Sequence, residues 1–115
     1  MKTVVLEVRS LEDSIQDFGR AWQGGKPDSS ARICFASAEL LWQVLTGKRW
    51  TILKTMTSAG ALSVREIARR VERDVKAVHA DVQALLRAGI LERSERRVVF
   101  PYDAVHVDFV LRAAA

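Results

Sequence analysis

The spacing of hydrophobic residues changes several times along this chain, and each spacing predicts a type of element. Between residues 63 and 88, apolar side chains recur at intervals of three and four, which is the period of an amphipathic α-helix. They form two runs, 63–71 and 75–88, with a short polar segment between them. The pattern predicts two short helices joined by a tight turn.

Both helices carry residues that favour helix ends. Ser63, followed three residues later by Glu66, matches a capping box, in which each side chain accepts a free N–H at the helix start. Asp74 is a favoured N-cap residue for the second helix, and Gly89 is favoured at its C-terminal end. These residues support the boundaries that the hydrophobic spacing predicts.

The first third of the chain predicts a β-α-β unit over residues 1–36. Residues 3–8 are rich in β-branched side chains, and residues 31–36 form a second candidate strand. Between them, Ser10 can cap a helix that ends before a loop at residues 24–30. The apolar stripe of this helix consists of Leu11, Ile15, Phe18 and Trp22.

Two further helices are expected before the pair described above. Ser37 can cap a short helix, and Thr46–Gly47 marks a break with a new cap. The next helix then extends from Lys48 to Ser58, and Gly60 ends it.

Strands are expected after the last helix. Residues 91–100 predict a β-hairpin, which Pro101 ends because proline cannot donate a ladder hydrogen bond. Residues 105–109 alternate apolar and polar side chains, so they predict a half-buried strand.

These elements together predict the α+β class with a winged helix-turn-helix. We expect the winged helix at residues 37–101, with its third helix able to enter the DNA major groove. The β-α-β unit at 1–36 and the C-terminal strand and tail at 102–115 form a thin core on their own. We therefore expect them to form a dimerisation section.

Positive charge is concentrated in the predicted winged helix. The net charge of the chain is +4. Residues 46–97 contain twelve Lys and Arg against six Asp and Glu, whereas the segments on either side each have a net charge of −1. Such asymmetry favours contact with a polyanion, and it argues against an ordinary helical hairpin with a solvated basic face.

The residue inventory argues against several other classes of protein. The single Cys34 excludes an intrachain disulfide, and two histidines with one cysteine are too few for a zinc site. The chain contains no nucleophile–base set and no glycine-rich phosphate loop, so we expect neither an enzyme nor a cofactor. It has no apolar run long enough for a membrane span or signal peptide, so we expect a soluble cytoplasmic protein.

Candidate DNA contacts divide into phosphate and base contacts. A solvated surface charge is the alternative for each cation. The phosphate candidates are Arg65, Arg69, Arg73 and Arg87, with Lys48 and Arg49 behind them and the cap residue Ser63 beside them. The base-edge candidates are Lys76 and Gln83, with Ala77 or Ala80 able to touch a thymine methyl. The hairpin candidates for the minor groove or its flanking phosphates are Arg93, Arg96 and Arg97.

Other residues of this region have less direct roles. His79 is a candidate for a phosphate contact, a local hydrogen bond or a metal ligand, although the chain offers few further ligands. Asp81 is expected to be neutralised by Arg87 or by a basic residue of the first helix, because an outward carboxylate would repel DNA. The three tryptophans are expected in the core, except that Trp42 lies off its apolar stripe and suits an interface.

From about residue 35 to 110 the chain resembles predicted winged-helix, MarR-like regulators of archaea and bacteria, many of them encoded beside small toxin genes. The most specific part of the match is the Arg-Asp-x-Lys-x-Val-His-x-Asp-Val run at 73–82. The other matching positions are Phe35–Ser37, Leu45–Thr46, Lys48–Arg49, Ser63–Ala68, Leu85, Gly89, Leu91 and Pro101–Asp103.

This resemblance implies sequence-specific binding of double-stranded DNA and autorepression, and an antitoxin role with a cognate toxin for some members. Two residues depart from the family pattern. Glu72 stands in the turn where glycine is usual, and Ala77 and Ala80 stand where longer side chains would suit base readout. The alternative function is a winged-helix adapter for protein or RNA without operator specificity.

Overall fold

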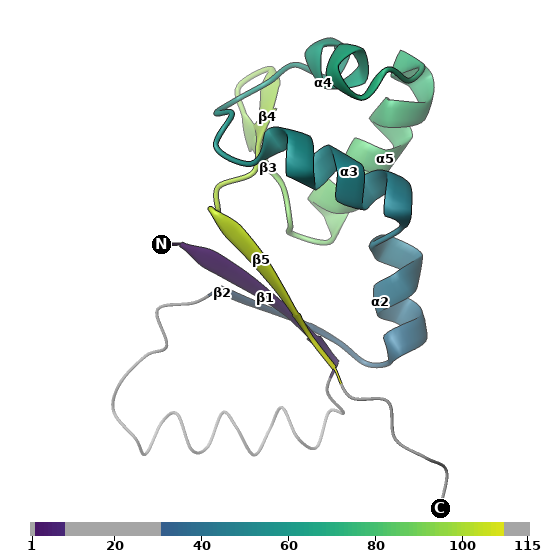
Figure 1. The fold of residues 1–115 in the computed structure, drawn as a ribbon, viewed down its shortest axis with the longest axis vertical. Coiled ribbons are helices and arrows are strands. Elements are labelled where there is room, and N and C mark those ends of the chain that lie inside the picture. The colour runs from purple at the N-terminus through teal and green to yellow at the C-terminus, as the bar shows by residue number, and fades with distance from the viewer. Residues whose placement is uncertain (1, 9–30, 110–115) are drawn as a thin grey trace, which may run out of the picture.

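The computed structural model describes residues 2–8 and 31–109, which form a mixed α+β structure (Figure 1). The predicted helix after Ser10, with its stripe Leu11, Ile15, Phe18 and Trp22, lies outside these residues. The described elements are β1 Thr3–Val8, β2 Ala31–Phe35, α2 Ala38–Val44, α3 Gly47–Met56, α4 Val64–Val71, α5 Val75–Arg87, β3 Glu92–Ser94, β4 Arg97–Val99 and β5 Ala104–Asp108.

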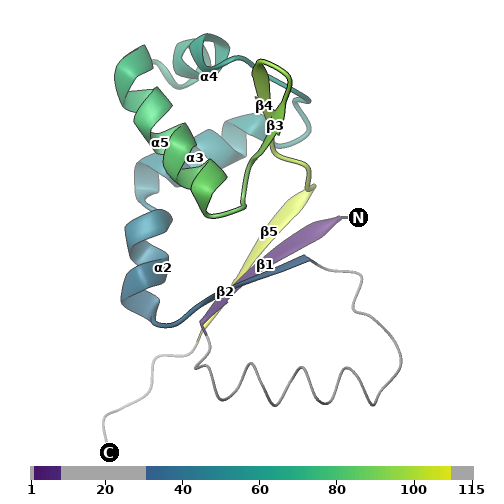
Figure 2. The ribbon, with the colours of Figure 1, turned by 180° about the vertical axis from the view of Figure 1, so that it is seen from behind.

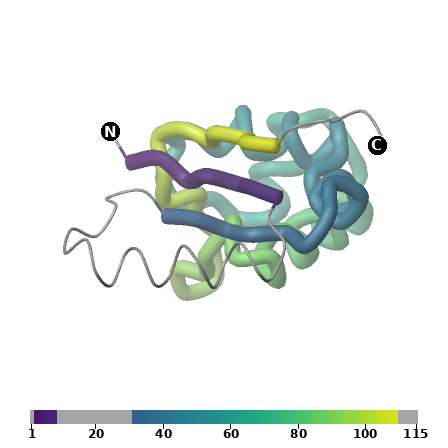
Figure 3. The backbone as a smooth tube through the Cα atoms, turned by 90° about the horizontal axis from the view of Figure 1, so that it is seen from below, coloured from purple at the N-terminus to yellow at the C-terminus, as the bar shows by residue number. Residues whose placement is uncertain are grey.

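Strands β1, β2 and β5 form a parallel sheet in the order β2-β1-β5 (Figure 3). The central strand β1 pairs Val4 with Ala31 on one side and with Val105 on the other. The predicted pairing of the N-terminal unit with the C-terminal strand is thereby confirmed.

Asp103 fixes the register of β5 against β1. Its Oδ2 accepts a hydrogen bond from the Lys2 backbone N–H at 2.8 Å, and its own N–H donates to the Lys2 carbonyl at 2.7 Å. Lys2 also places its Nζ 5.4 Å from the centroid of the Tyr102 ring. These contacts join the start of β1 to the start of β5.

Helix ends follow the sequence signals closely. The side chains of Ser37, Thr46, Ser63 and Asp74 all accept a backbone N–H of the first turn of the helix that they cap. At the end of α5, the N–H groups of Gly89 and Ile90 donate to the carbonyls of Leu86 and Leu85. This is a Schellman motif, with Gly89 at φ 82° in the left-handed position.

Two details of the helix boundaries were predicted wrongly. Helix α3 ends at Met56 rather than Ser58, since Thr57 is already extended and Ser58 has φ 60°. The capping box at Ser63 is half formed, because the Glu66 carboxylate bonds Arg69 and Arg70 instead of returning to the Ser63 N–H.

One hydrophobic core connects the sheet and the helices. Val4 and Leu6 of β1 are fully buried, and they belong to the same cluster as Leu41 of α2, Ile52 of α3 and Leu85 of α5. Figures 1 and 2 show α2 and α3 above this face of the sheet, with α4, α5 and the β3–β4 hairpin beyond them. None of the helices in the described residues is long and apolar enough to cross a membrane.

The tryptophans deviate from the expected core positions. Trp50 is 40% exposed and Trp42 is 52% exposed, so the prediction that Trp50 is a core residue was wrong. Trp42 makes an edge-to-face contact with Phe109, with ring centroids 5.4 Å apart. Trp22 lies outside the described residues.

Candidate nucleic-acid interface

Helices α4 and α5 are joined by the three-residue turn 72–74. The N–H groups of Glu72 and Arg73 donate to the carbonyls of Arg69 and Ala68, so α4 ends in a second Schellman motif. Glu72 takes the left-handed position of this motif, with φ 56° and ψ 47°. A non-glycine residue is disfavoured there because its Cβ approaches the following carbonyl.

Helix α5 has one buried and one exposed face. Val78, Val82 and Leu85 are fully buried against the core. Lys76, Ala80, Gln83 and Arg87 follow one another at intervals of four, three and four, which places them in one stripe along the opposite side. Lys76, Ala80 and Arg87 are exposed and Gln83 is half-buried.

Three further candidates extend or flank this stripe. Ala77 and His79 are exposed beside it, and the Nε2 atoms of His79 and Gln83 are 3.5 Å apart. Arg87 lies at the C-terminal end of α5, where it lines a cleft with Ile33 and Cys34 of β2. The N-terminal half of the helix therefore carries most of the exposed candidate residues.

Asp81 is neutralised by two arginines from outside α5. Its Oδ1 accepts a hydrogen bond from Arg49 Nε at 3.0 Å, and its Oδ2 lies 2.9 Å from Arg73 Nη2 in an ion pair. The expected neutralisation by the first helix is correct, whereas the partner Arg87 was predicted wrongly. Burial acts to raise the pKa of Asp81, but the hydrogen bonds and charges of Arg49 and Arg73 outweigh it and leave the pKa lowered.

Arg49 is a structural link between three helices. Its Nη1 donates to the carbonyls of Gln43 and Val44 at the end of α2, both at 3.0 Å, while its Nε holds Asp81 of α5. The side chains of Arg49 and Arg73 are only 19% and 22% exposed. The structure therefore places these two phosphate candidates inside the fold's own ion-pair network.

Glu66 pairs with two arginines on the surface of α4. Its carboxylate accepts hydrogen bonds from Arg69 and from Arg70 Nε, the latter at 2.9 Å. The hydrogen bonds from Arg69 and Arg70 lower the pKa of Glu66 to about 2. Arg69 remains 71% exposed, so its charge is partly compensated but accessible.

Arg65 and Lys48 are the remaining helical candidates. Both are exposed, and neither has an ion-pair partner among the described residues. Lys48 lies in the first turn of α3, next to the structural Arg49. Ser63 is occupied as the N-cap of α4, where its Oγ accepts the Glu66 N–H at 3.1 Å.

The hairpin arginines point to different sides. Arg93 lies opposite Val98, and Arg97 lies opposite Ser94, so Arg93 and Arg97 project from opposite faces of the two-stranded sheet. Arg96 follows Glu95 in the two-residue turn, where Glu95 has φ 58°. All three arginines are exposed.

A bridge that the sequence reading missed attaches the hairpin to the helices. Leu62, just before α4, exchanges two backbone hydrogen bonds of 2.8 Å with Val98 of β4. Both side chains are buried. The only available signal was the apolar Leu62 between Gly60 and Ser63, which is too short to predict a strand.

These contacts hold α5 and the hairpin on the same side of the helical layer. In Figure 2 they are nearest to the viewer, with α3 behind them. The exposed cations of this region that have no ion-pair partner among the described residues are Lys48, Arg65, Lys76, Arg87, Arg93, Arg96 and Arg97. A positively charged α5 face flanked by a basic hairpin is thus built on a fixed scaffold.

The chain is therefore a mixed α+β protein with a basic helical surface. A sequence model of the HVO_A0114 family matches residues 44–107, more than half of the chain, and the protein belongs to that family. The matched segment contains α3, α4, α5, the hairpin and most of β5. No curated protein and no solved structure matches the chain.

Proposed function

We propose that this protein is a winged-helix transcriptional regulator that binds double-stranded DNA. Helices α3, α4 and α5, the Leu62 bridge and the β3–β4 hairpin follow the order of elements of a winged helix. The observation that carries the proposal is the position of the exposed α5 stripe beside the basic hairpin (Figure 2). In such folds the third helix enters the major groove and the hairpin lies along the adjacent backbone.

The geometry divides the candidate contacts by role. We assign base-edge contacts to Lys76, Ala77, Ala80 and Gln83 of the exposed α5 face, with His79 beside them. Exposed cations around this stripe supply phosphate contacts; they are Lys48, Arg65, Arg69, Arg87, Arg93, Arg96 and Arg97. Arg49 and Arg73 position α5 through Asp81 instead of contacting DNA.

In this proposal the regulator is a dimeric autorepressor, as its resemblance to MarR-like regulators implies. An antitoxin role would add a toxin protein as a second partner. A dimer that reads two half-sites would require them to be centred about 34 Å apart, one turn of the duplex.

A winged-helix adapter for protein or RNA is the second candidate function. The observation that favours it is the presence of Ala77 and Ala80 on the exposed face of α5, since alanine offers no hydrogen bond to a base edge. An adapter would have no preference for an operator.

Fluorescence anisotropy over a salt series tests the proposal. Two duplexes are compared, the DNA upstream of the protein's own gene and a scrambled sequence of equal length. We expect tighter binding to the upstream duplex, with an affinity that falls as salt rises because bound cations are released. A steep salt dependence without preference would leave only backbone contacts, and no binding at low salt would favour the adapter.

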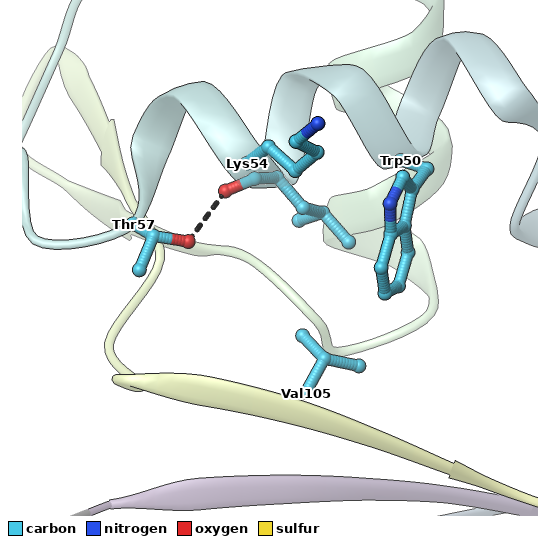
Figure 4. A pocket seen from close by; sticks show the side chains of 5 residues that line it. Trp50, Lys54, Thr57 and Val105 are labelled. Atoms are coloured by element: carbon cyan, nitrogen blue, oxygen red, sulfur yellow. Dashed lines mark hydrogen bonds between the residues drawn. The ribbon is translucent and has the colours of Figure 1, made fainter.

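Two alanine variants provide a matched comparison. Lys76 lies on the exposed face of α5, whereas Lys54 is an exposed lysine of α3 that lines a small pocket together with Val105 of β5 (Figure 4). Lys76→Ala should weaken DNA binding by about tenfold through loss of one charged contact, and Lys54→Ala should leave it unchanged. Equal losses in both variants would show that net charge, and not the α5 face, determines binding.

A further inference from the structure

Strand β5 is an edge of the three-stranded sheet. It pairs with β1 on one side, and no strand of the described residues pairs with its other side (Figure 3). An edge strand presents unpaired N–H and C=O groups, which makes it a template for a further strand. The strand has five residues, Ala104–Asp108, and Phe109 follows it directly.

An apolar groove lies beside this edge. Its volume is about 430 Å³, and its apolar lining includes Trp42 and Trp50 from the helices, Val107 of β5, and Phe109 directly after β5. A smaller neighbouring pocket of about 140 Å³ continues along α3, where Trp50, Lys54 and Thr57 line it together with Val105 of β5 (Figure 4). Inward side chains of an added strand would therefore find apolar surface next to β5.

We propose that a second copy of this chain occupies the groove by pairing its own β5 antiparallel to β5. The pairing generates one continuous six-stranded sheet through a two-fold axis perpendicular to it. Such an interface is isologous, since the same patch serves both copies. It uses the apolar face that the isolated chain leaves exposed.

The two-fold axis restricts the register to pairings in which one residue faces its own copy. When Val107 is that residue, Val105 lies opposite the partner's Phe109, and both face the helices. His106 then lies opposite the partner's Asp108, and both are on the exposed face. Each dimer contains this polar pair twice.

Polar complementarity favours this register over its neighbour. A shift to the pairing centred on His106 would place two histidines opposite each other and Asp108 opposite Ala104. An imidazole opposite Asp108 can donate a hydrogen bond to its carboxylate, whereas Ala104 offers that carboxylate no side-chain donor. The His106–Asp108 spacing of two residues is thus self-complementary around Val107.

The proposed dimer is independent of the DNA-binding proposal, and it is compatible with it. An axis perpendicular to the sheet leaves both helical layers on one side. Both α5 faces and hairpins would then lie on the same side of the joined sheet. Failure of DNA binding would not affect the dimer, which has its own test.

Sedimentation equilibrium of the full chain and three variants tests the dimer and its register. We expect the wild-type chain to dimerise at micromolar concentrations. His106→Asp opposes the partner's Asp108 twice and should weaken the dimer by about tenfold. The double variant His106→Asp with Asp108→Lys replaces this repulsion by a pair of opposite charges and should return the dissociation constant to near the wild-type value.

Arg97→Asp is the matched control, because it introduces a carboxylate on the exposed hairpin away from β5. It should leave the dimer unchanged. Far-ultraviolet circular dichroism checks that each variant keeps its folded secondary structure, which is expected because both substituted β5 side chains are exposed. A monomeric wild-type chain, or a double variant as weak as His106→Asp alone, would overturn the proposal.

Discussion

Arg49 Nε donates a 3.0 Å hydrogen bond to Asp81 Oδ1 and so joins the first turn of α3 to the middle of α5. The same guanidinium binds the last carbonyls of α2. Helix α5 carries the candidate DNA face on its other side. The orientation of that face therefore depends on the Arg49–Asp81 contact.

Asp81→Asn should lower the free energy of unfolding by about 2 kcal/mol, because hydrogen bonds to charged groups contribute about 1.5–3 kcal/mol and two arginines lose their countercharge. Urea unfolding measures the loss. Asp74→Asn is the control, since asparagine also caps helices well and the net charge change is the same. Equal stability of Asp81→Asn and the wild-type chain would contradict the structural role of this ion pair.

The ion pairs of Asp81 with Arg49 and Arg73 predict that the free energy of unfolding depends on pH. The pKa of Asp81 is lowered in the folded chain, so its contribution is fully present above the ordinary aspartate pKa of about 4 and is lost as the pH falls through the folded value. The stability difference between wild type and Asp81→Asn should therefore shrink on acidification. Urea midpoints at about pH 7 and about pH 3 measure it. A constant difference would indicate that the Asp81 charge does not contribute.

Glu72→Gly should stabilise the chain by about 1 kcal/mol. Glu72 adopts left-handed angles, which cost a side chain with a Cβ about 1–2 kcal/mol, partly offset by the greater flexibility of glycine when unfolded. Thermal or urea unfolding measures the gain. Glu72→Ala separates the effect of backbone strain from the effect of the glutamate charge, because it removes the charge but keeps the Cβ. A gain as large in Glu72→Ala would assign the effect to charge.

Asp103→Ala should destabilise the sheet by about 1 kcal/mol, because the Lys2 N–H loses its acceptor at the start of β1. Asp103→Asn keeps an amide oxygen in the same place and should lose less. Hydrogen exchange of the Lys2 amide reports the contact directly. Unchanged exchange in Asp103→Ala would show that the β1–β5 register does not need this side chain.

Local signals in the sequence predicted most element boundaries. Strand β1 and the caps Ser37, Thr46, Ser63 and Asp74 were found because their determinants lie within a few residues of one another. The capping box was only half right, since nearby Arg69 and Arg70 compete for the Glu66 carboxylate.

Contacts between residues far apart in the sequence could not be predicted from such local signals. The Leu62–Val98 bridge, the partners of Asp81 and the exposure of Trp50 depend on how separate elements meet in space. For the same reason the sequence could not separate Arg49 and Arg73, held in ion pairs, from the accessible Arg65. The sequence predicted the basic charge of this region, and the structure separates its accessible cations from those held in ion pairs.

The central place of β1 has a consequence for the order of folding. Its two neighbours are β2 and β5, and β5 follows it by about a hundred residues, as Thr3 pairs with Ala104. Forming the β1–β5 contact requires closing this long loop, which costs conformational entropy before any strand pairing can offset it. The α4–α5 contact costs less loop entropy, because a three-residue turn joins the two helices. During synthesis, α4 and α5 can therefore pack together before β5 has been made, whereas β1 can pair with β5 only after the ribosome has added residues 104–108.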